Sequence, residues 1–380
     1  MDLLEVVIRN FAFGGESYGV TASGKGCFVR GGVPGERVLV EVLQDSKRFF
    51  RGRLIEVLEP SSSRIESPCP AFPACPGCSF CHVDYAAELN AKQSSFERFL
   101  TRNGLADPAV IQPPVGAPER FFWRNKIKLA VENGRTGYRA SDNVSLIPVD
   151  RCLLVREEIN RAIGTAEVTA EDTALELRHL PDGSVLKLEP ANRAEVIRET
   201  LPDCGSFLVP AGGFFQTNRR VAALLVKEAV ELIARTGAEN MLELHCGTGI
   251  FSICAAESLP KLHCTGVEIA ADSIDCAVRN AAERDLEKRC TFTAAPADKK
   301  YRKTQLLLVD PPRTGIDNKL MGRILREPPE WMIYISCSAD TLCRDLEKLR
   351  TSGAEVCSAR LLDMFPATAH FESISLIKFH

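Results

Sequence analysis

The stretch MLELHCGTG at residues 241–249 has the pattern of a buried strand that runs into a glycine-rich turn. The segment IFSICAAES follows it with a helical pattern, and apolar segments then alternate with helical ones to the end of the chain. The apolar segments are LHCTGVEI, CTFTAA, QLLLVD, WMIYISC, EVCSARLLDMF and SISLIKF. Strands that alternate with helices predict an α/β fold with a parallel, doubly wound sheet.

Two acids stand at strand ends of this predicted sheet. Glu268 ends the second strand, about 20 residues after the glycines, where a carboxylate can hold ribose hydroxyls. Asp310 ends the fourth strand, and ligands of such sheets bind outside the carboxyl ends of the strands. A nicotinamide dinucleotide would suit the same arrangement, but the third glycine of the G-x-G-x-x-G spacing is missing.

Composition places the chain among ordinary globular proteins. It has 380 residues, of which 45% are hydrophobic and 26% charged, and its length suggests two or three domains. No stretch is long and apolar enough for a membrane span, and Asp2 and Glu5 interrupt any signal-like N-terminus, so we expect a cytoplasmic protein. The chain has fifteen cysteines. Because the cytoplasm keeps thiols reduced, we expect these cysteines to bind metal, act in catalysis or be buried, and not to form disulfides. The net charge of −3 gives no sign of nucleic-acid binding by the chain as a whole, but a local basic patch could still bind phosphates.

The N-terminal 60 residues have the pattern of a small β-barrel of the oligonucleotide-binding kind, with short strands separated by glycine-rich turns. Within it, Lys47–Arg53 mixes cations with aromatic residues, which suits either RNA contact or a solvated strand edge. A second basic-aromatic segment is Phe121–Lys128, where alternation puts Arg124, Lys126 and Lys128 on one strand face.

A short proline-rich run holds Cys69, Cys75 and Cys78, and such a run cannot form a buried core. Thiolates this close together suit a metal centre. With a fourth ligand they suit either zinc or an iron–sulfur cluster, and the spacing does not choose between them. A helix is predicted after this run from Asp84 to about Arg102, with Asp84 as its N-cap.

Five motifs occur in order along the chain. They are Phe28-Val29 with Pro34–Val38, Gly213–Asn218, Asp310–Arg313, Ser336–Ser338 and Phe365–Glu372. Their order and spacing resemble the RNA uridine-5 methyltransferases, which act on 23S ribosomal RNA or on tRNA. The resemblance covers nearly the whole chain.

The resemblance implies three domains. Residues 1–62 would be an OB-like barrel of the TRAM type, and residues 63–205 a central α+β domain with the cysteine cluster. Residues 206–380 would be a Rossmann-like class I domain that binds S-adenosylmethionine. RNA is the implied partner, and neither a membrane nor an obligate protein partner is expected.

The resemblance also implies ligand-binding residues. The residues expected to bind S-adenosylmethionine are Gln216, Glu268 and Asp310, with His245, Gly247 and Asp298 as further candidates. Some relatives have Asn after the G-x-G, and Ile250 stands there in this chain. The distant Cys152 would complete a 4Fe–4S cluster with the three clustered cysteines, and Cys81 is the rival for that place.

Cys337 and Glu372 are the implied catalytic pair. Cys337 ends the strand WMIYISC at the same edge of the sheet as Asp310, the rim formed by the carboxyl ends of the parallel strands. The N-terminus of the helix that follows should favour the Cys337 thiolate. Other cysteines, such as Cys254, sit inside apolar or helical segments and are expected to be buried small residues. A lone acid at the position of Glu372 would ordinarily be a solvated surface charge. Its place in the motif Phe365–Glu372 makes it the expected general base. His370 is expected either to orient Glu372 or to contact RNA.

The predicted activity is formation of 5-methyluridine, with Cys337 adding to carbon 6 of uridine. The barrel together with the cysteine cluster favours 23S ribosomal RNA, and tRNA is the alternative. Methyltransferases of exocyclic amines carry an aromatic residue where Arg313 stands, and cytosine-5 enzymes carry a Pro-Cys pair, so both are disfavoured. A non-catalytic RNA-binding protein with a degenerate methyltransferase fold is the alternative from another class.

Overall fold

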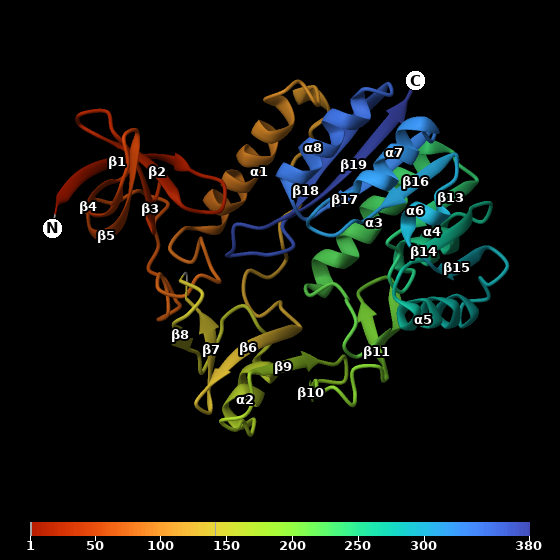
Figure 1. Cartoon of the computed structure of the whole chain (residues 1–380), viewed down its shortest axis with the longest axis horizontal. Coiled ribbons are helices and arrows are strands. Elements are labelled where there is room, and N and C mark those ends of the chain that lie inside the picture. The colour runs from red at the N-terminus through yellow and green to blue at the C-terminus, as the bar shows by residue number, and fades with distance from the viewer. Residues whose placement is uncertain (1, 141) are drawn as a thin grey trace.

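The computed structural model describes residues 2–140 and 142–380 and begins with a closed five-stranded barrel (Figure 1). The barrel strands, in the order β1-β2-β3-β5-β4, are β1 (Leu3–Phe11), β2 (Ser17–Thr21), β3 (Gly26–Arg30), β4 (Arg37–Asp45) and β5 (Phe49–Glu59). The predicted barrel is present, but the sequence pattern did not indicate β2. Gly19 breaks its apolar alternation, and a Cβ there would lie 2.5 Å from the side chain of Val6.

Helix α1 (Tyr85–Thr101) follows the cysteine-rich run, close to the range predicted for it. The Asp84 carboxylate caps the helix by accepting a hydrogen bond from the Ala87 backbone N–H at 2.8 Å. The buried face of α1 is formed by Glu88, Lys92, Phe96 and Leu100, which lie four residues apart. Two of these four residues are charged, which is unusual for a helix face that packs on a sheet.

The central part of the chain holds a five-stranded sheet in the order β10-β9-β6-β7-β8, the helix α2 (Glu157–Thr165) and a hairpin of β11 and β12. These strands are β6 (Lys126–Glu132), β7 (Arg135–Arg139), β8 (Leu146–Pro148), β9 (Ala174–His179), β10 (Val185–Lys187), β11 (Val196–Leu201) and β12 (Gly205–Pro210). A 3₁₀ turn, η1 (Pro108–Val110), precedes them. The expected boundary between residues 205 and 206 falls at the start of β12.

The C-terminal part is a seven-stranded sheet in the order β15-β14-β13-β16-β17-β19-β18. Its strands are β13 (Asn240–Leu244), β14 (His263–Glu268), β15 (Cys290–Ala294), β16 (Leu306–Val309), β17 (Trp331–Ser336), β18 (Ala354–Leu362) and β19 (Glu372–Phe379). The first five strands are parallel, as predicted, but β19 is antiparallel to both β17 and β18. The expectation of a wholly parallel sheet is therefore wrong at this edge. A loop rather than a helix joins β18 to β19, and such a connection pairs neighbouring strands antiparallel.

Helices cover both faces of this sheet (Figure 1). They are α3 (Arg219–Thr236), α4 (Ile250–Ser258), α5 (Ala271–Ala282), α6 (Ala297–Lys300), α7 (Asn318–Arg326) and α8 (Ala339–Arg350). Along β16, Leu306 and Leu308 pack in the core under α3 and α4, whereas Leu307 and Val309 pack in the core that contains α1, α7 and α8. This strict alternation explains why the strand is apolar throughout. In the part of the chain that the structure covers, no helix has the length and apolarity of a membrane span.

Candidate active site

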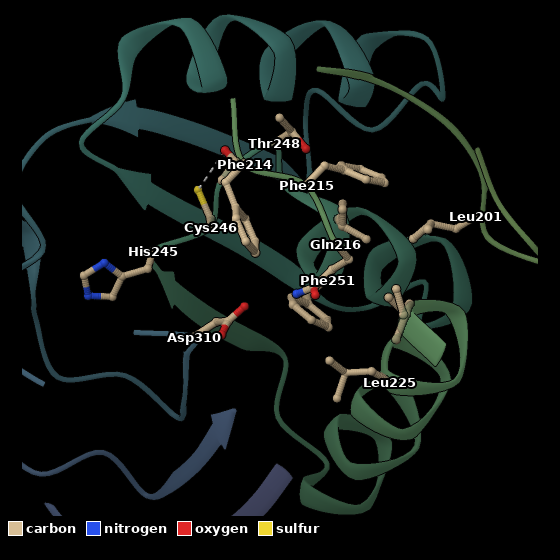
Figure 2. Close-up of a pocket in the computed structure, with 14 residues that line it drawn as sticks. Leu201, Phe214, Phe215, Gln216, Leu225, His245, Cys246, Thr248, Phe251 and Asp310 are labelled. Carbon is tan, nitrogen blue, oxygen red and sulfur yellow. Dashed lines mark hydrogen bonds between the residues drawn. The ribbon is translucent and has the colours of Figure 1, made fainter. Parts of the chain in front are cut away.

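A pocket opens at the carboxyl ends of β13 and β16 (Figure 2). It is lined by Phe214, Phe215 and Gln216 from the segment after β12, by His245, Gly247 and Thr248 after β13, and by Asp310 after β16. In Figure 2 the Asp310 carboxylate points across the pocket toward the Phe214 ring. The fold thus brings four of the six predicted cofactor residues, Gln216, His245, Gly247 and Asp310, to one pocket.

The glycine turn beside the pocket is held by Glu268. One carboxylate oxygen of Glu268 accepts from the Gly247 backbone N–H at 3.3 Å, and the other accepts from Ile269 at 2.7 Å and Ala270 at 3.1 Å. Gly249 has a φ of +81°, and a Cβ there would lie 2.6 Å from the Phe292 ring, so glycine is required. Glu268 therefore lies next to the pocket although it does not line it.

Asp298 lies in the first turn of α6 and is not among the residues that line the pocket. Glu243, which the sequence analysis did not single out, is buried on β13, and its carboxylate accepts from the Ser252 backbone N–H at 3.0 Å. Burial raises the pKa of Glu243 to about 8. An acid on a buried strand was the available signal for it in the sequence.

The predicted catalytic pair lies on the neighbouring part of the same rim. Strands β17 and β19 pair antiparallel with Ser336 opposite Ser373, so the adjoining positions Cys337 and Glu372 stand at the same end of the two strands. Glu372 is only 4% exposed, although an acid at a strand end is ordinarily solvated. The register therefore brings together two residues that are 35 positions apart in the sequence.

Electrostatics connect this pair to Asp310 and Arg313. The pKa of Cys337 is raised to about 11, first by burial and then by the negative charges of Glu372 and Asp310, whereas Arg313 opposes the shift. Burial also raises the pKa of Glu372 well above its usual range, again with Asp310 adding to the shift and Arg313 opposing it. Arg313 is thus the cation of this site, and its sequence signal was its place directly after the two prolines.

The helix whose N-terminus is expected to favour the Cys337 thiolate is α8, which begins at Ala339. Ser338 is the N-cap of α8, but its side chain makes no capping hydrogen bond and its hydroxyl donates to Asp340 instead. Burial disfavours the charged sulfur, and the expected effect of the helix end on the thiolate stays a prediction.

Comparison with known proteins agrees with this geometry. A family model described as tRNA (Uracil-5-)-methyltransferase matches residues 195–289 and 287–379. An RNA methyltransferase of Halalkalibacterium halodurans is 27% identical, over 99% of this chain and 97% of the relative. The 23S rRNA (uracil(1939)-C(5))-methyltransferase of Vibrio parahaemolyticus is 26% identical, over 93% of this chain and 91% of the relative. The C-terminal half of the chain thus matches the tRNA (Uracil-5-)-methyltransferase family model, and relatives that match over nearly the whole chain are RNA methyltransferases.

A solved structure shows that the similarity extends over the whole fold. The Pyrococcus abyssi tRNA (uracil-54, C5)-methyltransferase, crystallised with S-adenosyl-L-homocysteine, superposes with a TM-score of 0.75 at 23% identity. The match covers 98% of this chain and all of that one. The mixed α/β fold and the N-terminal barrel are therefore shared with that enzyme.

A second pocket gathers the predicted metal ligands. Cys69, Cys75, Cys78 and Cys152 line it together, next to Tyr138, whose hydroxyl donates to the Cys152 sulfur at 3.5 Å. Cys81 does not line the pocket and is fully buried in the adjacent core. Among the described residues, no three metal-binding side chains approach closely enough to hold one metal ion. The structure thus shows the four thiols around one space without showing a metal site.

The two basic-aromatic segments differ in whether their Arg and Lys side chains form ion pairs. In β5, Arg51 pairs with Glu16 and Arg53 with Glu41. On β6 the predicted alternation is present, with Ile127 buried between Lys126 and Lys128. Lys126 pairs with Glu176 at 3.0 Å, whereas Lys128 is exposed and has no ion pair within residues 2–140 and 142–380.

Proposed function

We propose that this RNA uracil-5 methyltransferase forms 5-methyluridine in 23S ribosomal RNA through a covalent Cys337 adduct. The observation that carries the mechanism is the shared rim, where Cys337, Glu372 and Asp310 meet at the ends of neighbouring strands. The preference for ribosomal RNA is supported by the Vibrio relative, which is named for that substrate. The Pyrococcus structure, named for tRNA, supports the alternative substrate.

Carbon 5 of uracil is too weak a nucleophile to take a methyl group unaided. The Cys337 thiolate adds to carbon 6, and the electron pair of the 5,6 double bond moves into an enolate. S-adenosylmethionine, when bound, supplies the methyl group that carbon 5 takes. Covalent addition by Cys337 thus divides one difficult step into easier ones.

Glu372 completes the reaction in this proposal. After methyl transfer, carbon 5 carries both the methyl group and its original proton. Glu372 removes that proton, the 5,6 double bond reforms, and the carbon–sulfur bond breaks to release the Cys337 thiolate. The uridine must leave its base stack to reach both residues.

We propose Gln216, His245, Gly247, Glu268, Asp298 and Asp310 as the residues that hold the cofactor. Five of them line or adjoin the pocket of Figure 2, and Asp310 lies between this pocket and the catalytic pair. We also propose that the division into a TRAM-like barrel, a central domain and a methyltransferase domain holds for residues 1–62, 63–205 and 206–380.

We propose a 4Fe–4S cluster as the group held by Cys69, Cys75, Cys78 and Cys152. The four thiols line one pocket, which a cluster ligand set requires. Four thiolates on one zinc must crowd around a single ion at about 2.3 Å, whereas cluster thiolates bind four different irons and lie farther apart. The choice of a cluster over zinc rests on the resemblance to the family, since the described residues show no metal site.

The cluster would order the cysteine-rich run and take no part in methyl transfer. Protein purified without oxygen should contain about four irons and four sulfides per chain. Stoichiometric zinc in that protein would refute the cluster.

The test of substrate is methylation mapping. Labelled S-adenosylmethionine is incubated with the protein and with 23S ribosomal RNA or tRNA from a strain that lacks the gene. We expect one 5-methyluridine in 23S ribosomal RNA and no reaction by Cys337→Ala, which should still bind both substrates. Methylation of tRNA alone would replace the proposed substrate, and methylation by Cys337→Ala would refute the mechanism.

A further inference from the structure

The loop between β18 and β19, residues 363–371, leads directly into Glu372 and lies beside α1 (Figure 1). Three charged side chains meet at its start. The Lys92 ammonium lies 2.8 Å from a Glu88 oxygen and 2.7 Å from an Asp363 oxygen, and each side chain is at most 1% exposed. A buried network of this kind is costly to form, so its contacts identify what it holds in place.

The network bonds directly to the loop. Glu88 accepts from the Ala367 backbone N–H at 2.6 Å, and Lys92 donates to the Phe365 carbonyl at 3.2 Å. The Tyr85 hydroxyl donates to Asp363 at 2.9 Å. Ala367 is fully buried and has a φ of +66°, a conformation that L residues adopt only when their surroundings enforce it. The Glu88 contact is one source of that enforcement.

The cysteine-rich run holds the opposite side of Ala367. The Ala367 carbonyl accepts from the backbone N–H groups of Ser79 at 2.9 Å and Phe80 at 3.0 Å. Arg120 joins the two sides, since it donates to the Phe80 carbonyl at 2.8 Å and lies 3.1 Å from Glu88. Both backbone polar groups of Ala367 are therefore fixed by elements far from it in sequence.

Glu372 itself has no such support. Within the described part of the chain, no hydrogen bond stabilises its carboxylate. Burial and Asp310 raise its pKa, and Arg313 lowers it. The position of its carboxylate therefore depends on the backbone that carries it. That backbone begins β19, where Glu372 lies opposite Leu362 of β18, and the loop that leads into it is anchored at Asp363, Phe365 and Ala367 by the network on α1.

We propose that Lys92, with Glu88 and Asp363, is a positioning residue for the proton-removal step. The network holds the loop so that Glu372 can reach the proton on carbon 5 after methyl transfer. This inference rests on the proposed role of Glu372 as the base. The network is proposed to affect the rate of one step, the breakdown of the protein–RNA adduct. Adduct formation and cofactor binding depend on other residues.

The test compares two rates in a single turnover, with the methyl donor labelled and with 23S ribosomal RNA as substrate. Lys92→Met removes the central charge, and Tyr85→Phe removes one hydroxyl, which donates to Asp363 and accepts from the Ala117 backbone N–H. Tyr301→Phe is the matched control, because its buried hydroxyl donates to the Glu327 carbonyl away from the loop. Rates are expressed per active site, so loss of folded protein does not alter them.

We expect Tyr85→Phe to break down the protein–RNA adduct about tenfold more slowly than the unaltered protein, since a hydrogen bond to a charged group is lost. Lys92→Met should be slower still, and labelled adduct should accumulate in both. Methyl transfer and cofactor affinity should match those of Tyr301→Phe. A merely structural network would lower the number of active sites and leave the breakdown rate per site unchanged, and that result would overturn the proposal.

Glu372→Gln, measured alongside, separates the two assignments. Adduct that accumulates in Glu372→Gln but not in Tyr85→Phe or Lys92→Met overturns the positioning role alone. A Glu372→Gln protein that leaves no adduct overturns the base and the positioning role together.

Discussion

Two groups of acids in this molecule have opposite surroundings. Beside α1, Glu88 and Asp363 are fully buried and share Lys92, with Tyr85 as a further donor. On the rim that carries Cys337, the carboxylates of Asp310 and Glu372 gain no stabilising hydrogen bond from any described residue. Acids whose partners are supplied by the protein hold the fold together, and acids left without partners are available to ligands.

The first prediction concerns removal of Lys92, the cation that Glu88 and Asp363 share. Lys92→Met leaves two buried carboxylates without their shared cation, so we expect a loss of about 3–5 kcal/mol in the free energy of unfolding. Chemical denaturation measures it. Glu372→Gln should not lower stability, because it neutralises a buried acid whose carboxylate no described residue stabilises by a hydrogen bond. Equal destabilisation by the two variants would remove the distinction between the two groups of acids.

The second prediction concerns cofactor affinity and its pH dependence. Burial and the charge of Glu268 raise the pKa of Asp310 to about 7. The carboxylate becomes protonated as pH falls through that value, so affinity for the cationic S-adenosylmethionine should fall between pH 8 and about pH 6. Asp310→Asn should bind about tenfold more weakly at pH 8. Calorimetric titration would contradict the account if the variant and the unaltered protein showed the same dependence.

The third prediction concerns the nucleophile. With the pKa of Cys337 raised to about 11, only the small thiolate fraction attacks at neutral pH. The rate of adduct formation should therefore rise about tenfold per pH unit between pH 7 and 9. Arg313→Gln removes the cation that lowers this pKa, so its rate should be several-fold lower at every pH in that range. A flat profile in the unaltered protein would show that RNA binding itself ionises Cys337.

The fourth and smallest effect is on RNA binding. Lys128 is exposed and has no ion pair among the described residues, whereas Lys126 is neutralised by Glu176. Lys128→Ala should reduce the salt dependence of RNA affinity by about one phosphate contact, and Lys126→Ala should reduce it less. Cofactor affinity should be unchanged in both. The same salt slope in all three proteins would place RNA on another face.

The same contrast shows what the sequence could predict. Asp310 and Cys337 could be placed on one rim because strand ends are visible as apolar runs, and parallel strands end at one edge. Asp84 could be placed at the start of α1 because its cap is local.

The paired acids were not predictable in this way. Glu88 and Lys92, four residues apart on a helix, are typical of a solvent-exposed pair. They are buried because Asp363, 271 positions away from Lys92, comes from the other end of the chain. The antiparallel β19 was missed for a related reason, since its place between β17 and β18 depends on long-range pairing. Local patterns carry no information on such partners.

The most direct test of the central claim is to identify the amino acid that links protein to RNA. Glu372→Gln is incubated with S-adenosylmethionine and unmodified 23S ribosomal RNA, and the linked material is digested and analysed by mass spectrometry. The account predicts a peptide that contains Cys337 bonded to a methylated uridine. A link through another cysteine, or methylated RNA with no link to protein at all, would contradict it.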